Sequence, residues 1–316
     1  MTDTLSLNSR VFVAGHLGLV GSAFIRRFQA DGYKNVITRD HESLDLCDAN
    51  HVQTFFKEQQ PEIVILAAGK VGGIVENKTY PADFITQNLL IQSNALRAAH
   101  LNHVKRLLFF GSSCMYPREC PQPMAEDLLL TGHPEPTSLA YAMAKLAGVQ
   151  MCLSYNQQYG NRVFLPVIPN SVYGANDNFD PGSGHVLSAL ISRFHGAKVR
   201  ADDQVTLWGT GSPRREFLFS DDLVSACLTL LQSASPELEF PINIGPGEDI
   251  SIKELAELTA SVIGYQGKIE WDTSKPDGTP RKLLDSSRMK STGWEAITSL
   301  RDGIRQTYEW YLKHKA

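Results

Sequence analysis

The sequence has 316 residues, of which 42% are hydrophobic and 20% charged, and its formal net charge is -4, as in an ordinary globular chain with a sizeable core. Lys and Arg are spread along the chain rather than gathered into a basic stripe, which argues against nucleic acid as a partner. No apolar run approaches the roughly 20 residues of a membrane-spanning helix and residues 1–10 are too polar for a signal peptide, so we expect a cytoplasmic protein without a membrane partner.

The first half of the chain alternates short apolar runs with helical patterns. Segments such as 22–31 and 88–100 carry apolar residues at the spacing of one helix face. Strands that alternate with right-handed crossover helices form a parallel sheet covered on both faces, which predicts an α/β fold with a doubly wound Rossmann sheet. The runs expected to be strands are 11–14, 36–37, 63–67, 106–110 and 163–168.

The alternation of apolar runs with helical patterns ends at about Asn176, where Asp-, Gly- and Pro-rich loops begin. We expect a helix near 186–194, turns around 202–214, and amphipathic helices over 251–263 and 299–312, the first opened by a Ser251 cap with Glu254. The predicted domains are a nucleotide-binding Rossmann domain over 1–175, to which 214–231 returns, and a smaller C-terminal α/β substrate lobe over most of 176–316.

Glycines follow the first expected strand directly and lead into a helical pattern. Without side chains, the backbone can approach a pyrophosphate, and the helix start offers free amide hydrogens and a positive dipole end. The Gly-x-x-Gly-x-x-Gly spacing differs from the Gly-x-Gly-x-x-Gly of simple dehydrogenases, but its position on the first strand favours a dinucleotide site. The predicted cofactor residues here are Gly15, His16, Leu17, Gly18, Leu19, Val20 and Gly21.

The end of the second expected strand bears on the choice of cofactor. NAD-binding proteins usually place an acidic residue there for the ribose hydroxyls, whereas this chain has Arg39 before Asp40. A guanidinium can clamp a 2'-phosphate with two hydrogen bonds, which favours NADPH over NADH. The alternative is a solvated Arg39 with Asp40 on the ribose. Ala67 and Ala68, after the third expected strand, are also predicted to contact the cofactor.

Tyr141 and Lys145 lie four residues apart and therefore share one face of a helix. We expect the cation to lower the pKa of the phenol, so that Tyr141 protonates a carbonyl oxygen as hydride arrives, while Lys145 also holds the nicotinamide ribose. Ser112, at the end of the fourth expected strand, is the hydroxyl predicted to bind the same oxygen.

Linked motifs along nearly the whole chain carry a family resemblance. Residues 15–21, 111–113 and 170–174, with Tyr141 and Lys145, resemble the extended short-chain dehydrogenase/reductase superfamily. Residues 15–22, 70–74, 80–84, 111–117, 177–179 and 215–218 resemble, more narrowly, the GDP-L-fucose synthase family. The resemblance implies NADPH-dependent 3,5-epimerisation and 4-reduction of GDP-4-keto-6-deoxy-D-mannose to GDP-L-fucose.

The resemblance also implies roles for a cysteine and a histidine. Cys114 stands where related dehydratases have a Glu, so dehydration is not expected, and in the synthase family it is the base that removes protons beside the ketone. His185 matches the histidine that supplies protons to the opposite face and also contacts the cofactor. Ser112 rather than Ser113 aligns with the active-site serine. The alternatives are an inert Cys114 thiol and a loop histidine bonded to backbone.

Other matched positions concern the substrate and a second subunit. Arg193, Trp208 and Arg215 match residues that hold the nucleotide diphosphate sugar, whereas Lys282 and Asp277 match less closely and are also consistent with solvated loop charges. Many bacterial relatives have Arg in place of Leu17, which weakens the NADPH prediction. Helices over 88–100 and 141–159 correspond to those that pair in the superfamily dimer, so we expect a homodimer, although these apolar faces could instead pack on the sheet.

Five cysteines, an odd number without a Cys-x-x-Cys pair or a nearby histidine cluster, predict reduced thiols and no metal site: Cys47, Cys114, Cys120, Cys152 and Cys227. Two rival functions remain open. Colitose-type and heptose-type enzymes use similar residues on a GDP-linked ketone. A non-catalytic NADPH-binding sensor is the other alternative, but Ser112, Tyr141 and Lys145 argue against it because a sensor needs none of them.

Overall fold

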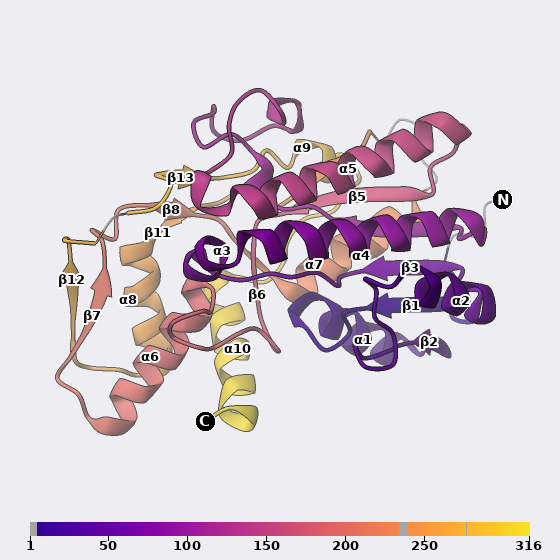
Figure 1. The fold of residues 1–316 in the computed structure, drawn as a ribbon. Helices are drawn as coiled ribbons and strands as arrows, with labels where there is room; N and C mark the ends of the chain where they lie inside the picture. Colours follow the sequence, from indigo (N-terminus) through magenta and orange to yellow (C-terminus); the bar gives the residue numbers. More distant parts are fainter. Residues whose placement is uncertain (1–4, 234–238, 276) are drawn as a thin grey trace.

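The computed structural model describes residues 5–233, 239–275 and 277–316. Its central sheet has six parallel strands in the order β10-β5-β4-β3-β1-β2 (Figure 1). The expected doubly wound α/β fold is therefore confirmed. The strands are β1 (Arg10–Ala14), β2 (Asn35–Ile37), β3 (Ile63–Leu66), β4 (Arg106–Phe110), β5 (Phe164–Pro169) and β10 (Ile242–Ile244).

Helices cover both faces of this sheet because alternate strand residues point to opposite sides and both sides are apolar. Phe12 and Phe109 face one side, where helices α2, α4 and α5 pack, and Val13 and Leu108 face the other, where α1 and α7 pack. Figure 1 shows α4 and α5 side by side across the sheet. These helices are α1 (Leu19–Asp31), α2 (Ala49–Gln59), α4 (Pro81–Leu101), α5 (Leu139–Tyr159) and α7 (Ser220–Gln232).

A smaller lobe lies beside the carboxyl ends of the central strands. Its apolar core, which includes Phe194, Leu255 and Ile304, joins three helices that Figure 1 shows on one side of the molecule. The helices are α6 (Val186–Arg200), α8 (Ile252–Ile263) and α10 (Leu300–His314). Three small sheets accompany them: β7 (Gln204–Trp208) with β12 (Lys268–Asp272), β6 (Ser171–Tyr173) with β9 (Phe217–Phe219), and β11 (Ile250–Ser251) with β8 (Arg214–Arg215) and β13 (Arg281–Lys282).

The expected strands of the central sheet and the expected helices are present, although α4 begins at Pro81 rather than near 88 and α6 continues to Arg200 rather than ending near 194. The capping box at the start of α8 is present, with Ser251 and Glu254 each bonding the other's backbone. Helix α4 begins at Pro81, whose fixed backbone angle suits the first helical turn. The expectation of turns alone over 202–214 was wrong, because residues 204–208 form β7. That strand is short, mostly exposed and followed by Gly209, which hides its pattern.

Segments from the C-terminal half return to the central sheet. Helix α7 packs on one face, β10 pairs with β5, and Met289 of α9 (Ser287–Lys290) lies in the same apolar cluster. The division near residue 175, with 214–231 returning to the first domain, stays a prediction, and β10 and α9 are further segments that lie on the sheet. Across the described residues, no helix combines the length and apolar character needed to cross a membrane.

Candidate active site

The predicted site residues of the first half gather at one edge of the sheet. Gly15 follows β1, Ala67 follows β3, and Ser112 lies just beyond β4. The carboxyl ends of parallel strands meet at the same edge, which is where ligands of doubly wound folds bind. Short helices α3 (Ile74–Thr79), η1 (Ser113–Met115) and η3 (Pro136–Ser138) lie along the connecting loops.

The glycine loop is tightly packed and ends in an uncapped helix. Gly15 has a φ of +78°, and a Cβ there would lie 2.7 Å from the backbone nitrogen of Ala68. A Cβ on Gly21 would overlap the carbonyl oxygen of Gly15. Gly18 precedes α1 with no side-chain cap, so the amide hydrogens of the first turn have no side-chain acceptor. This backbone arrangement fits a dinucleotide pyrophosphate.

Arg39 and Asp40 are placed differently at the end of β2. The guanidinium of Arg39 lies 5.5 Å from the centre of the Phe55 ring, and the residue is exposed. Asp40 accepts hydrogen bonds from the backbone and side chain of Ser43, and these bonds lower the pKa of its carboxyl. Because Asp40 closes this turn, Arg39 is the residue better placed to receive a phosphate.

Ser112 connects the other catalytic candidates. Its Oγ accepts a hydrogen bond from the Cys114 amide at 3.2 Å and caps η1. The same hydroxyl is close enough to the Tyr141 phenol and the Cys114 thiol to lower the pKa of both. Ser113, in contrast, is buried and only 7% exposed. These contacts support the choice of Ser112.

The thiol of Cys114 lies among positive charges. Burial raises its pKa, but Lys282, Ser112, His185 and Ser138 together outweigh this and bring the pKa below the ordinary thiol value. The Lys282 Nζ lies 3.8 Å from the Cys114 Sγ. A partly exposed thiol beside an ammonium group holds more thiolate at neutral pH, so more of it is in the form that can accept a proton.

The Tyr141–Lys145 pair departs from our expectation. Burial raises the pKa of the Tyr141 phenol, the Cys114 charge raises it further, and the Ser112 hydrogen bond lowers it only in part. Lys145 is itself buried, which lowers its pKa to about 8, and its Nζ lies 5.8 Å from the centre of the Tyr141 ring. The expected lowering of the phenol pKa was therefore wrong. A protonated phenol remains a suitable proton donor.

His185 stands at the amino end of α6, and half of its side chain is exposed. Its Nδ1 lies 3.6 Å from Oδ1 of Asp177, whose side chain is only 4% exposed. Pairing with Asp177 raises the pKa of His185, burial opposes this, and the charges of Cys114 and Glu76 add to the rise. The thiol and the imidazole are near enough for each to change the other's pKa.

The predicted substrate residues fall into two groups. Lys282 Nζ lies 3.8 Å from the Cys114 sulfur, and Arg215 lies close enough to Cys114 for the charge of the thiolate to oppose the lowering of the Arg215 pKa by burial. Trp208 is 63% exposed on β7 with the Lys275 Nζ over its ring, and Arg193 donates to the carbonyl of Pro181. Asp277 accepts two hydrogen bonds from Thr210 and so closes a turn.

Some residues of the site were missed by sequence reasoning. Asp177, Ser138 and Glu76 act on Cys114 or His185 from loops and a short helix, where no periodicity reveals contacts. The buried Asn170, after β5, donates to Glu216 and to the Lys282 carbonyl, which ties the β13 strand to the sheet. The motifs containing Asp177, Asn170 and Glu216 carried the family resemblance, which was the only sequence signal for them.

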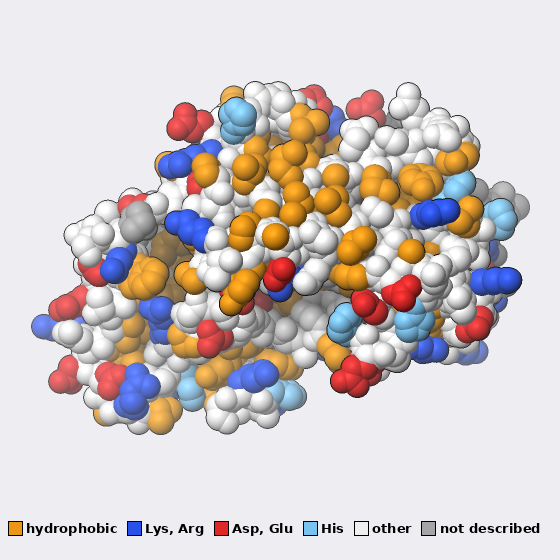
Figure 2. Space-filling view, in the orientation of Figure 1, with side chains coloured by type: hydrophobic (Ala, Val, Ile, Leu, Met, Phe, Trp, Pro, Cys, Tyr) orange, Lys and Arg blue, Asp and Glu red, His pale blue; other side chains and the backbone are white. Residues whose placement is uncertain are grey.

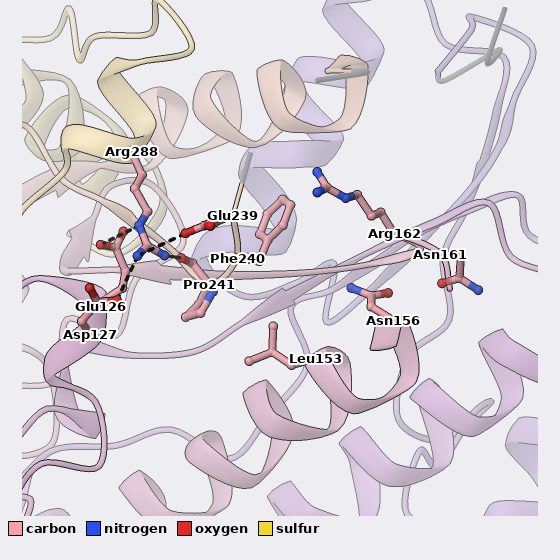
Figure 3. A pocket seen from close by; sticks show the side chains of 10 residues that line it. All are labelled: Glu126, Asp127, Leu153, Asn156, Asn161, Arg162, Glu239, Phe240, Pro241 and Arg288. Atoms are coloured by element: carbon pink, nitrogen blue, oxygen red, sulfur yellow. Dashed lines mark hydrogen bonds and ion pairs between the residues drawn. The ribbon is translucent and has the colours of Figure 1, made fainter. Parts of the chain in front are cut away.

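A separate surface cavity of about 410 Å³ lies away from these residues (Figure 3). It is found near the amino ends of β5 and β10, at the opposite edge of the sheet. Its Arg288 is already paired with Glu126 and Asp127, as the dashed lines of Figure 3 show. The cavity is therefore not the reaction site.

Comparisons with known proteins agree with this placement. Residues 11–245 match the family described as NAD dependent epimerase/dehydratase. The chain is 52% identical to GDP-L-fucose synthase 1 of Arabidopsis thaliana over 97% of this chain and 94% of that protein. It is 48% identical to GDP-L-fucose synthase of Escherichia coli K12 over 97% of both chains. The structure of MlghC, a GDP-mannoheptose C4 reductase from Campylobacter jejuni with NADP bound, aligns with a TM-score of 0.89 at 38% identity, covering 98% of this chain and 99% of that chain.

Proposed function

Because this chain belongs to the NAD dependent epimerase/dehydratase family and, within it, to the GDP-L-fucose synthases, we propose that it converts GDP-4-keto-6-deoxy-D-mannose to GDP-L-fucose. It is an enzyme, and its broader activity is that of a GDP-sugar epimerase/reductase. The observation that carries the proposal is the Cys114 thiol, held beside Lys282 and His185 and linked through Ser112 to Tyr141.

The cofactor is NADPH, which supplies the hydride for carbon 4 when bound. The glycine loop would hold its pyrophosphate, and Arg39 its 2'-phosphate. Lys145, behind Tyr141, would hold the nicotinamide ribose. Ala67 and Ala68 would line the same site next to Gly15.

The residues around Cys114 suit proton transfer beside a ketone. Loss of a proton from carbon 3 or carbon 5 moves charge onto the carbonyl oxygen, which Ser112 and Tyr141 can hydrogen-bond. Cys114 takes the proton as thiolate, and His185 returns one from the opposite face of the ring. Tyr141 then protonates the oxygen at carbon 4. Arg215 provides a guanidinium for the diphosphate, and Arg193 and Trp208 extend this surface.

One assay tests the proposal. The protein is mixed with NADPH and GDP-4-keto-6-deoxy-D-mannose in heavy water, cofactor absorbance is followed, and the product is analysed by NMR. We expect oxidation of NADPH and deuterium at carbons 3 and 5. If the sugar is reduced without taking up deuterium, the protein would instead act as a C4 reductase, like the Campylobacter jejuni enzyme. Binding of NADPH without turnover would leave the sensor alternative.

Arg39 is expected to determine the preference for NADPH. Replacing Arg39 with Met keeps an apolar chain against Phe55 but removes the charge, so the KM for NADPH should rise about 10- to 100-fold while the KM for NADH stays the same. Steady-state kinetics with both cofactors measure this. Arg27→Met removes an exposed arginine of α1 and is the matched control. Equal changes for both cofactors in Arg39→Met would contradict the assignment.

A homodimer through α4 and α5 is the proposed assembly. Figure 2 shows apolar side chains gathered over these helices, and Leu90, Leu101, Met143 and Tyr159 are each more than 40% exposed. A contiguous apolar face of this kind is typical of a subunit interface. We expect sedimentation at twice the 35.0 kDa mass of one chain and a shift towards monomer in Leu90→Glu. The control is Leu312→Glu on α10, whose side chain is 44% exposed.

A further inference from the structure

The contact between Asp177 and His185 has the geometry of a carboxylate that orients a proton donor. The Nδ1 of His185 lies 3.6 Å from Oδ1 of Asp177, which leaves Nε2 as the nitrogen available to a substrate. The Asp177 side chain is 4% exposed, whereas that of His185 is 53% exposed. A buried carboxylate thus supports an imidazole that is half exposed.

Asp177 is held in place by hydrogen bonds that are independent of His185. Its Oδ1 accepts from the Asn178 amide at 2.8 Å, and its Oδ2 accepts from the hydroxyl of Ser188, which is fully buried in α6. A carboxylate fixed by two other donors keeps its position. It therefore acts as a fixed negative charge beside the imidazole.

The loop between the two residues brings them together. Asp180 accepts hydrogen bonds from the amides of Gly182 and Ser183, and its carbonyl accepts from the Gly184 amide. A Cβ on Gly184 would overlap the Asn178 carbonyl oxygen, so the loop closes tightly only with glycine there. This closure returns the chain to His185 beside Asp177, just before α6 begins.

We propose that Asp177 is a positioning residue that orients the His185 imidazole and stabilises its protonated form. This inference rests on the proposed function, because it makes His185 the acid that faces the Cys114 base. The charged and titratable groups around His185 come from three elements: Asp177 from the loop before α6, Cys114 from η1 and Glu76 from α3. All three favour the imidazolium, and Asp177 makes the largest contribution, in agreement with the geometry.

The sign of the pH effect follows from these roles. Cys114 must be deprotonated and His185 protonated, so the rate of deuterium incorporation rises through the thiol pKa and falls through the imidazole pKa. Asp177 raises the imidazole pKa. In Asp177→Asn, the fall of the rate at alkaline pH, the alkaline limb of the profile, should therefore move to lower pH. Lys282→Met removes the ammonium beside the thiol, and it should instead move the acidic limb to higher pH.

The experiment combines the pH profile of deuterium incorporation with NMR titration of the 15N-labelled histidines in the NADP-bound protein. The His185 signal is assigned by its loss in His185→Gln. We expect the wild-type imidazole to titrate above the free value of about 6.5 and to titrate lower in Asp177→Asn. In mildly alkaline buffer, deuterium incorporation by that variant should fall about tenfold. Ser188→Ala, which keeps the carboxylate charge, should retain the alkaline limb.

Several outcomes would overturn this role for Asp177. If the wild-type His185 imidazole titrates at or below the free value, the role of Asp177 is contradicted. This measurement needs no variant, so it decides the question even if Asp177→Asn does not fold. If the His185 pKa is unchanged in Asp177→Asn, or shifts equally in Ser188→Ala, the role of Asp177 is structural instead. Wild-type protein that incorporates no deuterium would contradict the proposed function, while the titration would still decide whether Asp177 acts on His185.

Discussion

Replacing Cys114 with Ser is expected to lower deuterium incorporation at carbons 3 and 5 about a thousandfold, with NADPH binding unchanged. A serine hydroxyl in the same place is a far weaker acid than the thiol, so the charges of Lys282 and His185 cannot make it an effective base. Because Ser112, Tyr141 and Lys145 remain, loss of incorporation would reflect loss of the base. NMR of the product formed in heavy water measures the effect.

Cys120 is the matched control for this substitution. Its thiol is also half-buried and lies near Lys282, but burial raises its pKa, and the Lys282 charge offsets this only in part. We expect Cys120→Ser to incorporate deuterium at the wild-type rate. If Cys114→Ser did so as well, the base would have to be another group, and the proposed epimerisation mechanism would be wrong.

Tyr141→Phe should separate reduction from epimerisation. The raised pKa of the phenol keeps it protonated at neutral pH, so its removal takes away the proton for the oxygen at carbon 4. We expect NADPH oxidation to slow by about a thousandfold. Deuterium should still enter carbons 3 and 5, since Ser112 remains to hydrogen-bond the carbonyl oxygen. Cofactor absorbance and NMR of the unreduced sugar follow the two steps separately.

The control for Tyr141 lies on the same helix. Tyr159 is 46% exposed at the far end of α5, and Tyr159→Phe should reduce substrate normally. Cofactor binding, measured by the fluorescence of bound NADPH, should be retained in Tyr141→Phe. Normal NADPH oxidation in that variant would show that the proton for carbon 4 comes from elsewhere.

The sequence predicted those parts of the fold that follow from local periodicity. Buried strands such as Ile63–Leu66 are continuous apolar runs, and helices such as Ile252–Ile263 combine one apolar face with a recognisable cap. The strand Gln204–Trp208 was missed because it is short and pairs only with residues 268–272, far along the chain. Local patterns carry no information about such a distant partner.

The candidate site was predicted unevenly for the same reason. Ser112 and Cys114 follow a strand, and Tyr141 and Lys145 share a helix face, so their proximity could be inferred. The pKa of Tyr141 could not, because burial outweighs the expected effect of Lys145, and burial depends on the whole fold. The pairing of Asp177 with His185 depends on a closed loop, and spacing alone gives no sign of it.

The return of β10 to the central sheet bears on how the chain can be divided. A fragment that ends near residue 175 would expose the edge of β5 that Ile242–Ile244 pairs with. It would also lack Leu223 and Met289, which belong to the same buried apolar cluster as Val13 and Leu165. An open strand edge beside bare apolar surface favours aggregation. The nucleotide-binding unit should therefore be expressed only as part of the entire polypeptide, and a split-protein design would need its break in a surface loop rather than between the lobes.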